Sequence, residues 1–272
     1  MSNNIKNNTT SLQEVLRIVK AKSTLPTEQY NLGYADGTAA GVVQGEKSAY
    51  DAFWDSAQNY GNARNYSYSF SGRCWTVDTF KPKYDIITTS ASNMFNRSGI
   101  TGSLSEILKA QGVELKLTTS TCENMFVLTL FTEIDLDAST VTNMNNAFLQ
   151  STKLATINLV LPTATTVSWY DTFYQCTSLI DLKLTGKIYS RKYDNTNYAI
   201  SLAWSKKLNK ESIINVIECL DESVTGQIIT LSLTAVNNAF ETSTGAADGS
   251  TSTEWQTLIS TRSNWTINLL DK

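Results

Sequence analysis

Apolar and polar positions alternate with different spacings along the chain, and each spacing predicts a different element. Residues 11–26 carry apolar side chains at helical spacing after a capping box of Ser11 and Glu14, which predicts a short helix ending near Pro26. Aromatic and polar residues alternate in NYSYSF, residues 65–70, and this alternation predicts a half-buried strand.

Glycines recur at a four-residue interval before an aromatic segment near residue 50. The stripe consists of Gly33, Gly37, Gly41 and Gly45. Helical glycines cost about 1 kcal/mol each relative to alanine, so a packed backbone must offset them if this segment is a helix. We expect the stripe to be a packing face, either for a homo-oligomer or for the rest of the same chain; the alternative is that its first half is not helical.

Three later segments align on Phe126, Phe148 and Phe173, which are 22 and 25 residues apart. Each is followed by an apolar-x-apolar tripeptide, which predicts a short strand of a parallel sheet with its middle residue in solvent. The three middle residues are Asp135, Asn158 and Lys183, and weaker copies of the motif surround Phe95 and Phe240. An Asn or Asp two positions before each Phe predicts a turn, at Asn93, Asn124, Asn146, Asp171 and Asn238.

Helices interrupt this array where capping residues precede apolar positions. We predict one helix from the capping box of Ser103 and Glu106 to Gly112, one over Lys210 to Leu220 after Asn209, and one after Thr251 and Glu254. The chain therefore divides into an N-terminal helical anchoring or oligomerisation segment (1–60), a cap (61–88) and a repeat domain (89–272).

The string TFYQCTSLIDLKL, residues 172–184, and its weaker copies AFLQSTKLATINL and MFVLTLFTEIDLD resemble the BspA-like leucine-rich repeats. The similarity covers about residues 90–185. It implies an α/β solenoid of irregular leucine-rich repeats, with a parallel sheet of short strands, inserted helices and an N-terminal helical segment plus cap. This resemblance is specific for fold and weak for function, because one fold hosts many roles.

Composition removes several classes of function. A net charge of -3 leaves no basic excess for nucleic acid, and the absence of histidine removes His-based nucleophilic catalysis and His-ligated metals. The four cysteines lie at least 43 residues apart, which disfavours a zinc or redox site and favours buried free thiols. We expect neither enzymatic activity, nor a metal, nor a cofactor.

The start of the chain has no signal-peptide pattern, and no apolar run reaches about 18 residues, so we expect no membrane insertion. The SLQEVLRIV, GYADGTAAGVVQGEKSAYDAFWD and SGRCWTVDTFKPKYDI segments look like leading parts of phage or prophage virion proteins of gut Gram-positive bacteria. This resemblance implies a tail-associated protein, released by lysis, with host recognition or structural assembly as its role.

We therefore expect a non-enzymatic virion-associated protein that binds a protein or surface glycan, and possible partners include other virion proteins. The alternative is a BspA-like adhesin on the bacterial surface. Aromatic and arginine side chains dominate binding hot spots, and residues near 186–204 are rich in them. The candidate contact residues are Trp169, Tyr170, Tyr189, Arg191, Tyr193, Tyr198 and Trp204. The competing interpretation is that most of these side chains pack against the edge of the array.

Overall fold

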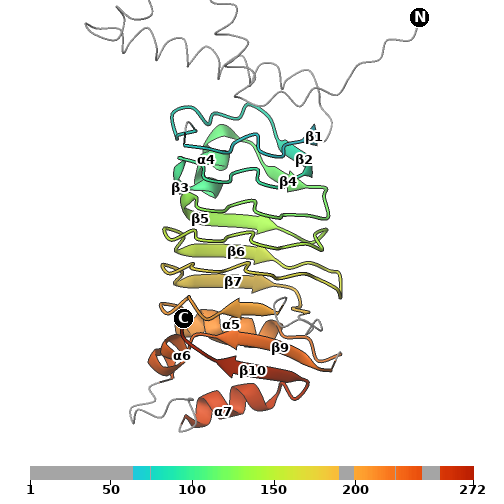
Figure 1. Cartoon of the computed structure of the whole chain (residues 1–272), viewed down its shortest axis with the longest axis vertical. Helices are drawn as coiled ribbons and strands as arrows, with labels where there is room; N and C mark the ends of the chain where they lie inside the picture. The colour runs from blue at the N-terminus through green and yellow to red at the C-terminus, as the bar shows by residue number, and fades with distance from the viewer. Residues whose placement is uncertain (1–63, 74, 190–198, 224, 241–251) are drawn as a thin grey trace, which may run out of the picture.

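The computed structural model describes residues 64–73, 75–189, 199–223, 225–240 and 252–272. These residues form parallel sheets with few helices, an α/β arrangement that extends along one axis (Figure 1). The predicted N-terminal helix, the glycine stripe Gly33 to Gly45 and Cys74 lie outside the described residues.

Three sheets follow one another, and every strand pair in them is parallel. The first contains β1 (Arg64–Asn65), β2 (Ile86–Ser90) and β4 (Leu115–Leu117); the second contains β3 (Thr101–Ser103), β5 (Leu130–Asp137), β6 (Thr156–Val160) and β7 (Asp181–Thr185); the third contains β8 (Ile200–Leu202), β9 (Gln227–Leu231) and β10 (Trp265–Leu269). The described helices are α4 (Leu104–Gln111), α5 (Lys210–Cys219), α6 (Leu233–Ala239) and α7 (Thr253–Ser260).

The register of the second sheet confirms the predicted tripeptides. Ile157 of β6 pairs with Ile134 of β5 and Leu182 of β7, and all three are buried. One position further, Asn158 lies between Asp135 and Lys183, and its amide donates a hydrogen bond to the Asp135 carboxylate at 2.6 Å. Because alternate side chains of a strand point to opposite faces, the inner positions fill the core and the middle positions form the outer face.

Five phenylalanines stack into a column in the core, where Phe95 and Phe126 also contact Phe131 of β5, and we call the chain around each one a level. Neighbouring rings of the column lie 5.2, 5.4, 5.5 and 5.5 Å apart, and none is more than 1% exposed. The column consists of Phe70, Phe95, Phe126, Phe148 and Phe173. A second buried column of small residues lies three positions after each phenylalanine from Phe95 onward, at Ser98, Thr129, Ser151 and Cys176.

Backbone geometry at each level explains this stacking. The residues two before and two after each phenylalanine have positive φ, so the chain makes a compact turn there. Alternate N–H groups then bond either within the turn or to the next level: the Ala147 N–H donates to the Met144 carbonyl, whereas the Phe148 N–H donates to the Thr172 carbonyl. The predicted turns at Asn93, Asn124, Asn146 and Asp171 are confirmed, since these residues occupy the first positive-φ position.

Residues 65–70 were expected to form a strand, and this prediction is wrong. Only Arg64–Asn65 is a strand, and the following residues form the first turn, in which Tyr68 and Gly72 have positive φ. Phe70 then begins the phenylalanine column. The aromatic alternation arises because Tyr66 and Phe70 point into the core while Tyr68 is 56% exposed at the turn. The predicted cap therefore has the same turn geometry as the levels that follow it.

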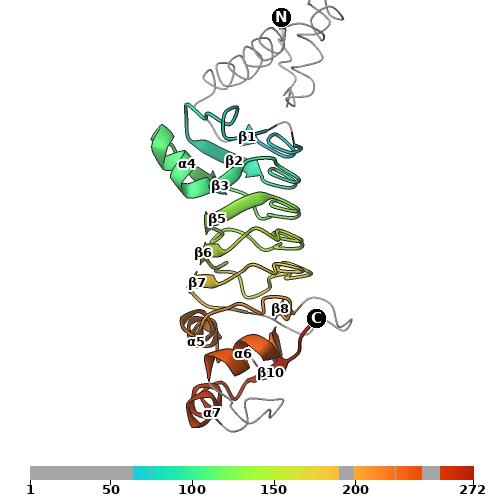
Figure 2. The same ribbon diagram turned by 90° about the vertical axis from the view of Figure 1, so that its left-hand side faces the viewer.

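Helices α4 and α5 flank the two ends of the second sheet (Figures 1 and 2). Ser105 of α4 accepts a hydrogen bond from the Asp135 N–H at 3.0 Å. On α5, Ser212 accepts from the Leu182 N–H at 2.8 Å, and Asn215 accepts from the Leu184 N–H at 2.6 Å. Edge strands expose unpaired backbone groups, so these side chains supply the partners that a further strand would have provided.

Both of these helices were predicted, with their caps. Ser103 caps α4 and Gly112 ends it with φ 66°, while Asn209 caps α5. The predicted cap of α7 is off by one residue: Ser252 accepts the Trp255 N–H, and Thr251 lies outside the described residues.

The C-terminal region is built differently. Strands β8, β9 and β10 pair in register, with Leu202, Leu231 and Leu269 in one row. Asn238 and Phe240 were predicted to form another turn, but Asn238 lies in α6 and Phe240 follows it, packing on the Trp255 ring at 5.2 Å. The N-cap Ser232 favours this helix, which the NNAF similarity concealed.

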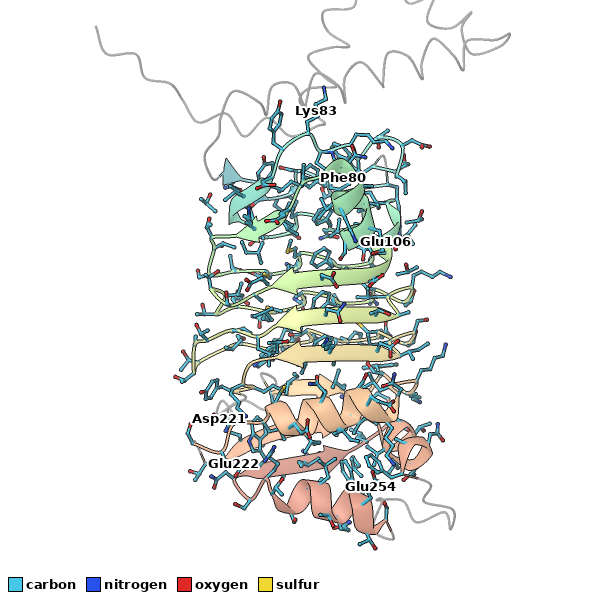
Figure 3. The ribbon with its side chains drawn as sticks, turned by 180° about the vertical axis from the view of Figure 1, so that it is seen from behind. Phe80, Lys83, Glu106, Asp221, Glu222 and Glu254 are labelled. Carbon is cyan, nitrogen blue, oxygen red and sulfur yellow. The ribbon has the colours of Figure 1, made fainter. Side chains whose placement is uncertain are left out.

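Helices α5 and α7 of this region lie on the same side of the molecule as α4, as seen in Figures 2 and 3. Glu254 of α7 bonds to Lys210 of α5 at 2.6 Å. The segment after α5 holds β10, because the Trp265 indole donates to the Asp221 carbonyl at 2.7 Å and the Asn264 side chain donates to the Glu222 carbonyl at 2.6 Å. Two helices and the last strand are thus joined by polar contacts.

Candidate functional site

The structure distributes the predicted contact residues between the core and the surface. Trp169 is 1% exposed and lies in the core, where its indole N–H donates to the Tyr189 carbonyl at 2.8 Å. It therefore stabilises the stack and presents no contact surface. Trp169 stands four residues before Phe173. The equivalent positions before Phe148 and Phe126 hold Met144 and Cys122, which are buried as well.

Of the other predicted residues, some have half-buried side chains and the rest lie outside the described residues. Tyr170, Tyr189 and Trp204 are half-buried. The Tyr170 N–H donates to the Asn145 side chain at 3.1 Å, which fixes this part of the level. Three predicted residues, Arg191, Tyr193 and Tyr198, lie outside the described residues.

Trp204 meets a tyrosine that sequence analysis did not select. The rings of Trp204 and Tyr174 lie 5.1 Å apart and 61° from parallel, which is an edge-type contact. Gln175, the residue that follows Tyr174, accepts a hydrogen bond from the Gln150 amide at 2.8 Å. We call Gln150, Tyr174, Gln175 and Trp204 the aromatic–amide corner.

Turn geometry positions these four residues. Gln150 and Gln175 hold the second positive-φ position of their levels, with φ 56° and 57°. The Gln150 N–H donates to the Tyr174 carbonyl at 2.7 Å, so a backbone hydrogen bond joins the two levels at these residues. Trp204 follows Leu202 by two residues, as Gln175 follows Phe173, and thus extends the same row. All four side chains are half-buried.

One polar group of this corner lacks a partner. The Trp204 Nε1–H is buried and has no hydrogen-bond partner. A buried donor without a partner costs about 1–3 kcal/mol, so native proteins rarely contain one without a reason. The corner thus combines aromatic surface, amide hydrogen-bonding groups and an unsatisfied donor.

A second polar surface covers the outer face of β5, β6 and β7. Asp135, Asn158 and Lys183 lie side by side across the three strands. Charge varies along this row, and the aromatic rings of the corner lie outside it. It is an ordered polar face without the aromatic groups that usually anchor recognition.

Burial and hydrogen bonds shift the pKa values of several titratable groups in the described residues. The hydrogen bond from the Ser223 side chain lowers the pKa of Asp221 below its usual value. Desolvation acts to raise the pKa of Asp271, but hydrogen bonds from Thr234 and Ser232 outweigh it and lower that pKa. Burial raises the pKa of Cys122 and Cys176 to about 12, so both thiols stay protonated at neutral pH.

Cys122, Cys176 and Cys219 are buried free thiols, which confirms that prediction for the described cysteines. Among the described residues, no group of three or more Asp, Glu, Cys or His side chains could hold a metal ion. None of the described helices is both long enough and apolar enough to cross a bilayer.

Comparison of the chain with models of protein families, with curated proteins and with solved structures finds no match. The candidate site therefore depends on the geometry of the chain itself.

Sequence analysis missed Tyr174, Gln150 and Gln175, although a signal for them was present. They stand one or two positions after Phe148 and Phe173, within the aligned segments. Selecting residues by local richness in aromatics chose Trp169, which is buried, and overlooked the outer positions of the alignment. Comparing equivalent positions between levels would have separated core residues from surface residues.

Proposed function

We propose that this protein is a non-enzymatic recognition protein whose solenoid of BspA-like leucine-rich repeats displays a binding surface. In the setting we favour, it is associated with a phage or prophage virion and takes part in host recognition. The observation that carries the proposal is the contrast between equivalent positions inside and outside the levels. The buried positions hold similar residues at every level, whereas the equivalent surface positions differ in size, polarity and charge from one level to the next.

The position two after each phenylalanine illustrates this variation. From the first level to the fifth it is occupied by Gly72, Arg97, Leu128, Gln150 and Gln175, and none of these residues is buried. The phenylalanine itself is retained at all five levels. A scaffold that keeps its core and varies its surface can present many different side chains without a change in fold, which suits recognition.

Stacking also brings residues that are distant in sequence into one surface. Gln150 and Gln175 are hydrogen-bonded, and Trp204 extends their row. Aromatic anchors beside polar groups are typical of binding hot spots. The same surface, raised in copy number by an oligomer formed through the Gly33 to Gly45 stripe, would gain avidity for a repetitive cell surface.

The virion setting has a direct test. Particles purified after lysis of cells that produce the protein should contain it in constant ratio to the major virion proteins across a density gradient. A secreted pool in non-lysing cells, with none in particles, would instead support the bacterial adhesin role.

Recognition has a separate test that uses the labelled full chain and intact Gram-positive cells. Saturable binding that is displaced by unlabelled chain would support the proposal. Absence of binding to every strain that the particles infect would overturn host recognition.

A further inference from the structure

We infer that the aromatic–amide corner is a saccharide subsite that takes a neutral sugar ring. This inference rests on the proposed recognition function and names the ligand class of that surface. Its basis is the contact between the Tyr174 and Trp204 rings, together with the hydrogen bond between Gln150, whose backbone bonds to that of Tyr174, and Gln175, which follows Tyr174 in the chain.

A pyranose ring has an apolar C–H face and a rim of hydroxyl groups. The half-buried rings of Tyr174 and Trp204 offer apolar surface at low entropic cost, since each side chain has two torsions. Their edge-type contact at 5.1 Å and 61° holds the two rings at an angle to each other. In this proposal the sugar ring packs against the part of these two half-buried side chains that remains exposed.

The amides match the hydroxyl rim. Each glutamine side chain has donor and acceptor groups, and one bond between Gln150 and Gln175 leaves further capacity on both. Because both backbones are held in tight turns, with φ 56° and 57°, the two side chains are positioned before a ligand arrives.

Charge selects the ligand class. None of the four corner residues is ionisable near neutral pH. An anionic polymer would find no cation among them, whereas neutral hydroxyl groups would find both donors and acceptors. The Trp204 Nε1–H is buried and has no hydrogen-bond partner in the free protein.

The test is affinity electrophoresis of the full chain in gels that contain soluble glucan, galactan or mannan, with glycerol-phosphate teichoic acid as the anionic comparison. We expect at least one neutral polysaccharide to retard the protein. Gln150→Ala/Gln175→Ala should weaken that retardation about tenfold, the equivalent of about 1.4 kcal/mol, with an unchanged melting temperature. Trp204→Phe, which keeps a ring and removes the N–H, should weaken it less.

The matched control is Gln111→Ala/Gln256→Ala, which removes two exposed glutamines from α4 and α7 and should retain full retardation. Retardation by teichoic acid alone, or by no polymer, would overturn the inference. So would an equal effect of the corner and control variants. If the labelled chain binds cells and the corner variant binds equally well, the saccharide subsite fails while the recognition function stands.

Discussion

Two regions satisfy their backbone N–H and C=O groups in different ways: the levels around Phe70 to Phe173 and the C-terminal region 199–272. In both regions each stacked stretch of chain must find hydrogen-bond partners for these groups. The phenylalanine levels do so with left-handed turns, whose N–H groups alternate between local and inter-level bonds. The C-terminal region uses regular strands β8, β9 and β10, with α5 and α7 on the helical side of the molecule.

The two regions nevertheless share one framework. Leu202 stands three residues before the buried Ser205, as Phe173 stands three residues before Cys176. Ser205 donates to the Cys176 carbonyl, and Cys176 donates to the Phe148 carbonyl. The small-residue column therefore continues across the boundary while the large column changes from Phe to Leu. The buried columns of side chains continue through both regions, whereas the backbone around them forms left-handed turns in one region and regular strands in the other.

The largest expected effect is the loss of a ring within the phenylalanine column. Phe148 stacks on Phe126 and Phe173 at 5.5 Å on each side, and it is fully buried. Phe148→Ala should lower the free energy of unfolding by about 3–5 kcal/mol, because it removes buried surface and leaves a cavity. Urea denaturation of the full chain followed by circular dichroism measures this change, and a loss below about 1 kcal/mol would contradict the column.

A milder pair of variants probes the boundary between the regions. Phe173 has a ring neighbour in the column on one side only among the described residues, since Leu202 follows it. Phe148→Leu should therefore cost about 0.5–1.5 kcal/mol more than Phe173→Leu, the value of one aromatic pair. Equal losses would show that ring stacking adds nothing beyond burial.

The next effect concerns the helix that replaces a strand at β7. The Asn215 side chain accepts the Leu184 N–H at 2.6 Å and donates to the Leu184 carbonyl at 3.1 Å. Asn215→Leu leaves both groups without these partners and should cost about 2 kcal/mol in the same urea experiment. The control Asn238→Leu alters an exposed residue of α6 and should stay within about 0.5 kcal/mol of wild type. A similar loss in both would assign the effect to helix composition.

Two asparagines distinguish the regions more finely. Asn146 has φ 55°, a conformation that costs most side-chain-bearing residues about 1–2 kcal/mol. Asn146→Ala should therefore destabilise by about 1 kcal/mol, and Asn146→Gly should restore stability. Asn238 is helical, so Asn238→Ala should stabilise by up to about 0.5 kcal/mol. Thermal melts of the three variants check the signs; a loss at Asn238 would support a turn there after all.

These asparagines also show how far the sequence predicted the fold. The NNAF string is shared by residues 145–148 and 237–240, yet the first forms a turn and the second ends a helix. The difference lies outside the string. Ser232 caps α6 before the second copy, whereas N–H groups in the turn around Phe148 donate hydrogen bonds to carbonyls of the next level. Local similarity predicted the burial of the tripeptides and phenylalanines, whereas the local backbone depended on what lies in the next level.

The candidate site was predicted less well for a related reason. Trp204 was selected and lies at the corner, but its partner Tyr174 belongs to another level, 30 residues earlier. Trp169 resembles a surface anchor by type, and only its position four residues before Phe173 marks it as core. Residue type alone therefore did not separate the two tryptophans, whereas the alignment of levels does.

The smallest effect is a pH dependence concentrated in the C-terminal region. The Asp271 carboxylate accepts hydrogen bonds from Ser232 at 2.7 Å and from Thr234, which tie the segment after β10 to the start of α6. Its pKa is lowered from 3.8 in the folded protein, so its contribution to stability is present above that value and is lost as the pH falls through the folded pKa. Asp271→Asn should flatten the fall in melting temperature below about pH 4 relative to wild type. Parallel curves for wild type and Asp271→Asn would show that this carboxylate does not link the tail of the chain to its fold.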